Sequence, residues 1–161
     1  MKGILTGLFI STGWDAKKVK KALDILVSYP GLSDRAKSYL GKKLANPGNQ
    51  ADHEILFRAL GYTGFTRELY PAGCRYDDVD AVREEQWRLV KALAPCLLNG
   101  DILMLETLEK ADGILGDDIY YGYRIRDGHA VRLGVSLREI YEAGEKPGPL
   151  ITYEGTVIFR I

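Results

Sequence analysis

The strongest candidate for catalysis in this sequence is His129, which lies at the expected exit of a hairpin, two residues after Asp127. Imidazole titrates close to neutral pH, so a histidine held beside a carboxylate can work as a general base. With Asp127 or Asp118 as the carboxylate, His129 would give a small hydrolase. The sequence assigns no nucleophile. The alternative is that His129 closes the end of an apolar strand face, and the balance leans away from an enzyme.

Other groups that could do chemistry have simpler interpretations. Asp77, Asp78 and Asp80 lie at the start of an expected helix, where carboxylates cap free N–H groups. Asp117 and Asp118 precede an expected strand, which is typical of a solvated turn. The two cysteines and two histidines lie more than twenty residues apart in the chain, whereas zinc ligands usually come in close pairs. We therefore expect no metal and no cofactor.

The two cysteines do not form a disulfide framework in a chain of this length. Cys96 lies in an apolar run, which predicts a buried and inert thiol. Cys74 follows a Pro-Ala-Gly sequence and is expected in a more accessible loop. With no apolar run long enough to span a membrane, the chain is expected to be cytoplasmic.

Charge is unevenly distributed along the chain. Residues 1–48 hold nine basic and three acidic side chains, residues 76–118 hold four and eleven, and the net charge is zero. The basic excess lies on the outer faces of the first two expected helices, at Lys17, Lys18, Lys20, Lys21, Lys37, Lys42 and Lys43. These faces could bind nucleic acid, or they could be ordinary solvated faces. A net charge of zero argues against a dedicated polyanion-binding protein.

Ten tyrosines are present, and one of them, Tyr120, is expected beside Arg124 and Arg132 on the outer face of a hairpin. Tyrosine and arginine are enriched at protein interfaces and at their energetic hot spots. These three residues are therefore predicted to bind another protein, most simply as an inhibitor or immunity-like regulatory protein.

The hairpin register decides whether that face exists. A two-residue Asp127-Gly128 loop would pair Tyr123 with Arg132 and mix polar with apolar side chains on each face. A three-residue loop pairs Tyr123 with Val131 and leaves one apolar face and one face with Tyr120, Arg124 and Arg132. Because a shift of one residue moves every side chain to the other face, we predict the three-residue loop.

Apolar residues recur with the helical period of 3.6 in the first part of the chain and with the strand period of 2 in the later part. Helices are expected from the Asp15 cap to Ser28, from the Ser33 cap to Ala45, from the Asn49 cap to Leu60, and over residues 78–94. Residues 102–110 fit either a helix or a strand. Strands are expected over the first ten residues and in two C-terminal hairpins.

Together these elements predict a single α+β domain over residues 1–161, in which a helical N-terminal half packs on a small antiparallel sheet built from the two C-terminal hairpins and the first strand. The expected function is non-enzymatic binding of another protein. A small hydrolase centred on His129 and a nucleic-acid-binding protein remain the alternatives, and no membrane partner is expected.

Overall fold

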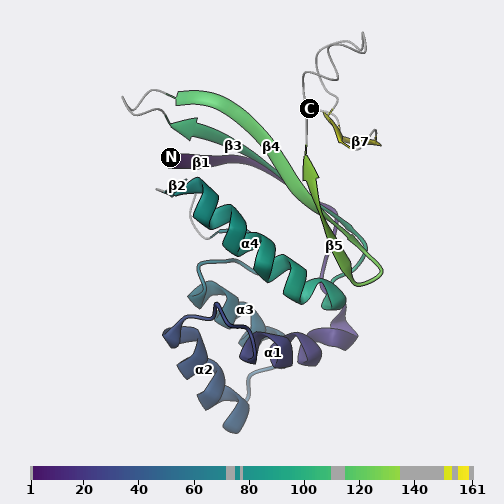
Figure 1. Cartoon of the computed structure of the whole chain (residues 1–161). Helices are drawn as coiled ribbons and strands as arrows, with labels where there is room; N and C mark the ends of the chain where they lie inside the picture. Colours follow the sequence, from purple (N-terminus) through teal and green to yellow (C-terminus); the bar gives the residue numbers. More distant parts are fainter. Residues whose placement is uncertain are drawn as a thin grey trace.

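The computed structural model describes residues 2–71, 75–76, 78–109, 115–134, 151–153 and 156–159. The predicted fold class is confirmed: helices fill most of the N-terminal half and an antiparallel sheet dominates the C-terminal half (Figure 1). In chain order the elements are β1 (Lys2–Ile10), η1 (Ala16–Lys18), α1 (Val19–Val27), α2 (Asp34–Ala45), α3 (Asp52–Tyr62), β2 (Arg75–Tyr76), α4 (Val79–Leu93), η2 (Ala94–Cys96), β3 (Gly100–Glu109), β4 (Leu115–Arg126), β5 (His129–Gly134), β6 (Ile151–Tyr153) and β7 (Thr156–Phe159).

The main sheet has five strands in the order β2-β1-β3-β4-β5, with every neighbouring pair antiparallel. Of the ambiguous segment 102–110, residues 102–109 belong to the central strand β3, which β1 and β4 flank and pair with along almost its whole length; residue 110 lies outside the described residues. The first strand and the first hairpin join this sheet as predicted. The second hairpin, β6-β7, forms a separate two-stranded sheet.

One helix covers the main sheet. α4 runs along one face of it (Figure 1) and buries Leu89, Val90 and Leu93. The Trp87 ring of α4 stacks on Tyr123 of β4, with the ring centroids 5.8 Å apart. Stacked aromatic pairs of this kind stabilise the fold beyond the apolar area that they bury.

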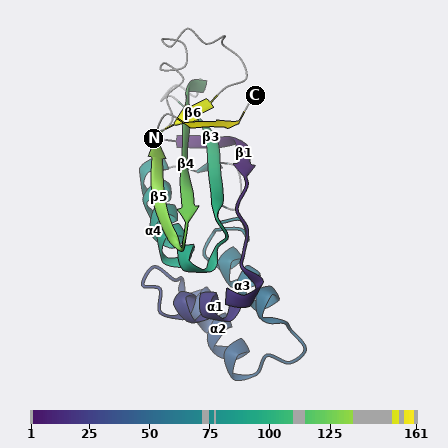
Figure 2. The same ribbon diagram turned by 90° about the vertical axis from the view of Figure 1, so that its right-hand side faces the viewer.

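The other helices, α1, α2 and α3, gather beyond one end of the sheet (Figure 2). α1 turns Val19, Ala22, Leu23 and Leu26 inward, and their spacing of three and four residues puts them on one face of the helix. Val27 is apolar too, but it is 47% exposed. It follows Leu26 by one position, which turns it about 100° from that residue to the edge of the buried stripe.

Helix caps were predicted with mixed success. Asp15, Ser33 and Asp78 each accept a backbone N–H at a helix start, as expected. The prediction that Asn49 caps the third helix is wrong. α3 starts after Ala51, whose N–H donates to the Glu54 carboxylate at 3.1 Å.

The predicted three-residue hairpin loop is also wrong. β4 and β5 are joined by the two-residue loop Asp127-Gly128, and Tyr123 lies opposite Arg132. Both loop residues have positive φ, 49° and 79°, as a type I′ turn requires, and the twist of that turn matches the twist of the strands. Turn geometry therefore outweighs the segregation of polar and apolar side chains.

Candidate functional site

The predicted Tyr120, Arg124 and Arg132 surface is not assembled. Arg124 and Arg132 lie on opposite faces of the sheet, because Arg132 pairs with Tyr123 across the strands. The Tyr120 backbone pairs with Leu105, while its side chain lies outside the described residues.

Each of the two arginines is engaged within the molecule. Arg124 Nε lies 3.0 Å from Asp101 Oδ1, and both side chains are less than one-fifth exposed. Arg132 contacts a Glu84 oxygen at 2.6 Å, and its guanidinium lies 5.0 Å from the centre of the Trp87 ring. The hydrogen bond from Arg132 lowers the pKa of the Glu84 carboxyl below its usual value. The hairpin therefore does not present a free arginine pair to a partner.

His129 is exposed at the first position of β5. Asp127 is held by Asn99, whose side-chain oxygen accepts the Asp127 N–H at 2.8 Å. Within the described part of the chain, no hydrogen bond or ion pair joins the His129 ring to a carboxylate. The Asp118 side chain lies outside the described residues. Among the described side chains, the catalytic candidates His129 and Asp127 are thus not joined by a hydrogen bond or ion pair.

His129 does line an open hollow of about 720 Å³ between the β4-β5 turn and the start of α1. Lys18 and Lys21 also line it, and Asp15, Asn99 and Asp127 complete its polar lining. Lys18 lies 3.9 Å from Asp15, and the two side chains are 48% and 27% exposed, so solvent screens this long ion pair and makes it weak. We call this space the His129 hollow.

A second open hollow, of about 510 Å³, lies on the other side of the same helical segment. It is lined by Lys17 and Lys20, by Asp52 and His53 of α3, and by the Trp14 and Phe57 rings. The His53 and Phe57 rings approach with their centroids 6.0 Å apart. We call this space the His53 hollow.

The helical repeat explains why the four lysines divide in this way. Residues three apart lie on the same side of a helix, so Lys17 and Lys20 face one hollow while Lys18 and Lys21 face the other. All four are exposed. We call these four residues the lysine surface.

The other predicted lysines, Lys37, Lys42 and Lys43, belong to α2. Lys37 and Lys42 are exposed and Lys43 is half-buried. None of them lines either hollow. Of the lysines expected on the outer faces of the first two helices, the four of η1 and α1 therefore border these two hollows and the three of α2 do not.

Trp14 lines the His53 hollow together with Lys17 and Lys20 and is absent from the sequence-based candidates. Its indole N–H donates to the backbone oxygen of Arg67 at 2.6 Å, and its ring lies 6.2 Å from that of Phe57. The signal in the sequence that could have pointed to Trp14 is its position directly before Asp15 and the lysines. No local pattern could show that Phe57 or Arg67 would lie against it.

Among the described residues, no cluster of three or more histidine, cysteine or acidic side chains is arranged to hold a metal ion. Of the helices in those same ranges, none has the length and apolar character to cross a membrane.

Comparison of the chain with protein-family models, with curated proteins and with solved structures finds no match in any of the three.

Proposed function

We propose that this protein is a non-enzymatic binding protein whose partner is an acidic segment of another protein, held on the lysine surface. The observation that carries the proposal is the pair of hollows on either side of one helical segment, each lined by two exposed lysines and a histidine. Concave surface brings a bound chain within reach of several cations at once. We place this binding in the cytoplasm because the sequence carries only two cysteines.

The lining of the hollows favours an acidic protein over a nucleic acid. Asp15 and Asp127 line the His129 hollow, and Asp52 lines the His53 hollow. These carboxylates would repel a phosphate backbone that runs through either space. A protein segment can place a carboxylate against each lysine and a neutral or basic residue beside each aspartate. A net charge of zero agrees with such a mixed surface.

A nucleic-acid-binding surface would be favoured if the lysines continued into free cations such as Arg124 and Arg132. Both arginines are paired with carboxylates of the same chain, Asp101 and Glu84. They therefore add little to a positive field over the lysine surface.

The hydrolase alternative needs His129 beside a carboxylate, Asp127 or Asp118. A general base needs its partner within hydrogen-bonding distance, and among the described residues His129 has none. A histidine on the wall of an open hollow fits the recognition of a carboxylate as well as it fits proton transfer.

The test compares three fluorescent probes by anisotropy: a glutamate-rich peptide, a lysine-rich peptide of equal length, and a single-stranded oligothymidylate. The glutamate-rich peptide should bind most tightly and should weaken as salt rises from about 50 to about 200 mM, because exposed charges are screened. Tighter binding of the oligonucleotide, with a steep salt dependence, would instead identify a nucleic-acid-binding protein. Equal binding of the two peptides would contradict the proposal.

A further inference from the structure

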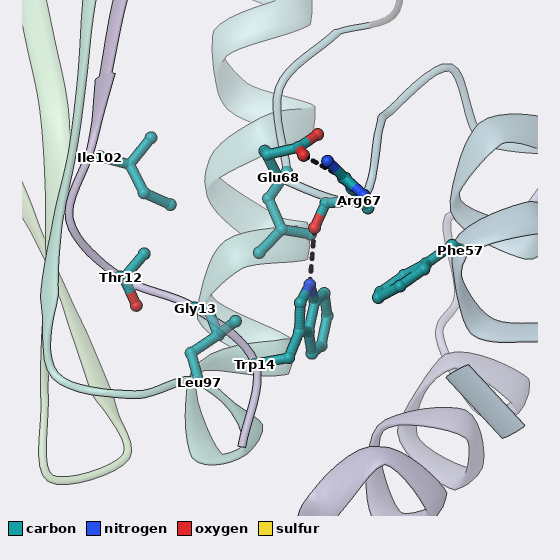
Figure 3. A pocket seen from close by; sticks show the side chains of 9 residues that line it. Thr12, Gly13, Trp14, Phe57, Arg67, Glu68, Leu97 and Ile102 are labelled. Atoms are coloured by element: carbon teal, nitrogen blue, oxygen red, sulfur yellow. Dashed lines mark hydrogen bonds and ion pairs between the residues drawn. The ribbon is translucent and has the colours of Figure 1, made fainter. Parts of the chain in front are cut away.

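A third cavity is lined by Trp14 and Phe57 together with residues of the Arg67–Leu69 segment and none of the four lysines (Figure 3). Its volume is about 270 Å³, and most of its lining is apolar, from Trp14, Phe57, Leu69, Leu97 and Ile102. Thr12 and the pair Arg67 and Glu68 add the polar groups. We call this space the Trp14 cavity.

The walls of this cavity are fixed by hydrogen bonds from distant parts of the chain. The Trp14 indole N–H holds the Arg67 carbonyl at 2.6 Å, and the buried Gln86 side chain donates to the Leu69 carbonyl at 3.0 Å. Leu69 is buried and has a φ of 64°. A bulky residue adopts this conformation only where the surroundings enforce it. The segment from Arg67 to Leu69 is therefore held in place before any ligand arrives.

Size and lining define the chemistry of an occupant. An apolar cavity of about 150 Å³ is enough for one benzene ring, so the Trp14 cavity has room for a larger aromatic group. The Glu68 carboxylate can accept a hydrogen bond, although it also pairs with Arg67. The Thr12 hydroxyl donates its hydrogen to the Leu98 carbonyl, so the Thr12 oxygen can still accept a hydrogen bond from a ligand. A ring with one N–H or O–H donor, an indole or a phenol, matches this arrangement.

The Trp14 cavity and the His53 hollow share two walls, Trp14 and Phe57. A chain that crosses these two rings reaches the apolar cavity on one side and Lys17 and Lys20 on the other. Aromatic side chains buried in such pockets dominate the energetics of many interfaces.

We propose that the Trp14 cavity receives a tryptophan or tyrosine side chain of the partner, next to the acidic residues held by the lysine surface. This inference rests on the proposed function and adds the anchor residue that the acidic segment must carry.

The experiment uses two peptides and one free ring compound. The peptides are a glutamate-rich peptide with one tryptophan and the same peptide with alanine in its place. The ring compound is indole. Binding is followed by anisotropy and by the indole N–H signals of ¹⁵N-labelled protein. The chain has only two tryptophans, and Trp87, stacked on Tyr123 away from the cavity, serves as the internal reference.

The tryptophan peptide should bind at least about tenfold more tightly than the alanine peptide, and it should shift the Trp14 signal while leaving that of Trp87 in place. Thr12→Leu, which adds bulk to the cavity wall, should remove this preference. Thr63→Leu is the matched control, because Thr63 makes the same kind of hydroxyl-to-carbonyl bond, to Leu60, and does not line the cavity.

Equal affinity of the two peptides would overturn the inference while leaving the proposed function in place. Failure of both peptides to bind would overturn both. A Trp14 shift with free indole but no preference between the peptides would assign the cavity to a small aromatic molecule, and so would overturn the assignment to a partner side chain.

Discussion

Trp14 and Arg67 are joined by a hydrogen bond of 2.6 Å from the indole N–H to the backbone oxygen, across 53 positions of the chain. The bond ties the junction between β1 and η1 to the segment that precedes β2. It fixes the ring that separates the Trp14 cavity from the His53 hollow, and thus the shape of both.

Trp14→Phe keeps an apolar ring at this position and removes the N–H donor. We expect the free energy of unfolding to fall by about 1–2 kcal/mol, because the Arg67 carbonyl loses its partner. Urea denaturation followed by circular dichroism measures the change. Arg67→Ala is the control: it keeps the backbone acceptor, and the side chain is exposed, so its effect should stay within about 0.5 kcal/mol. A larger loss in Arg67→Ala than in Trp14→Phe would contradict the role given to the indole bond.

Gln86 is fully buried and links α4 to β4 and to the loop that precedes β2. It donates to the Leu69 carbonyl at 3.0 Å and accepts the Tyr123 hydroxyl at 2.9 Å. Gln86→Met has a similar shape and leaves both groups without a partner, so we expect a loss of about 2–4 kcal/mol in the free energy of unfolding. With Tyr123→Phe added, the double variant should lose less than the sum of the two single losses, because the orphaned hydroxyl is gone. Strictly additive losses would show that Gln86 and Tyr123 act independently.

Two buried tyrosines predict how stability depends on alkaline pH. Burial raises the pKa of Tyr123. Burial, followed by the hydrogen bond to Glu85, raises the pKa of Tyr29. Both values therefore lie above the usual tyrosine pKa of about 10. Above that pH the unfolded chain binds fewer protons than the native chain, so the free energy of unfolding decreases as pH rises.

The corresponding measurement is a set of urea denaturation curves between about pH 8 and about pH 11. The part of the stability that comes from these two tyrosines should be complete below about pH 10 and should decline above it. The variant Tyr29→Phe/Tyr123→Phe should be less stable at pH 8 and should decline less steeply. A wild-type stability that rises above pH 10 would refute the assignment.

Cys96 is fully buried, and burial raises the pKa of its thiol. The thiolate is the reactive form. Burial and the raised pKa should therefore both keep Cys96 from reacting with thiol reagents in the native protein. Cys74 lies outside the described residues, and Cys74→Ser leaves Cys96 as the only thiol. Ellman's reagent at about pH 8 should give no rapid reaction with this variant in buffer and one thiol per chain in guanidinium. Rapid reaction in buffer would contradict the buried position.

Local signals predicted much of this fold. The caps at Asp15, Ser33 and Asp78 follow from side chains that bond to the nearest backbone N–H groups. The strand at β3 was ambiguous because its residues suit either state, and the choice depends on β1 and β4, which pair with it from distant parts of the chain.

The hairpin register was predicted wrongly because Arg132 was assumed to avoid the Tyr123 face. Its long side chain instead reaches across that face to Glu84 and Trp87 at the edge of α4. For the candidate site, the lysines are visible in the sequence. The aromatic rings and the hollows beside them arise from contacts between Trp14, Phe57 and Arg67 that only the folded chain creates.

The central claim, that the lysine surface binds an acidic segment, is tested most directly by reversing charge at two matched places. Lys18→Glu/Lys21→Glu changes the wall of the His129 hollow, and Lys37→Glu/Lys42→Glu makes the same change in net charge on exposed positions of α2. Affinity for the glutamate-rich peptide is measured with both variants at about 50 mM salt, where surface charges are weakly screened. We predict a loss of at least about tenfold, or about 1.4 kcal/mol, for the first variant and less than about twofold for the second. Equal losses in the two variants, or an unchanged affinity in the first, would contradict the account.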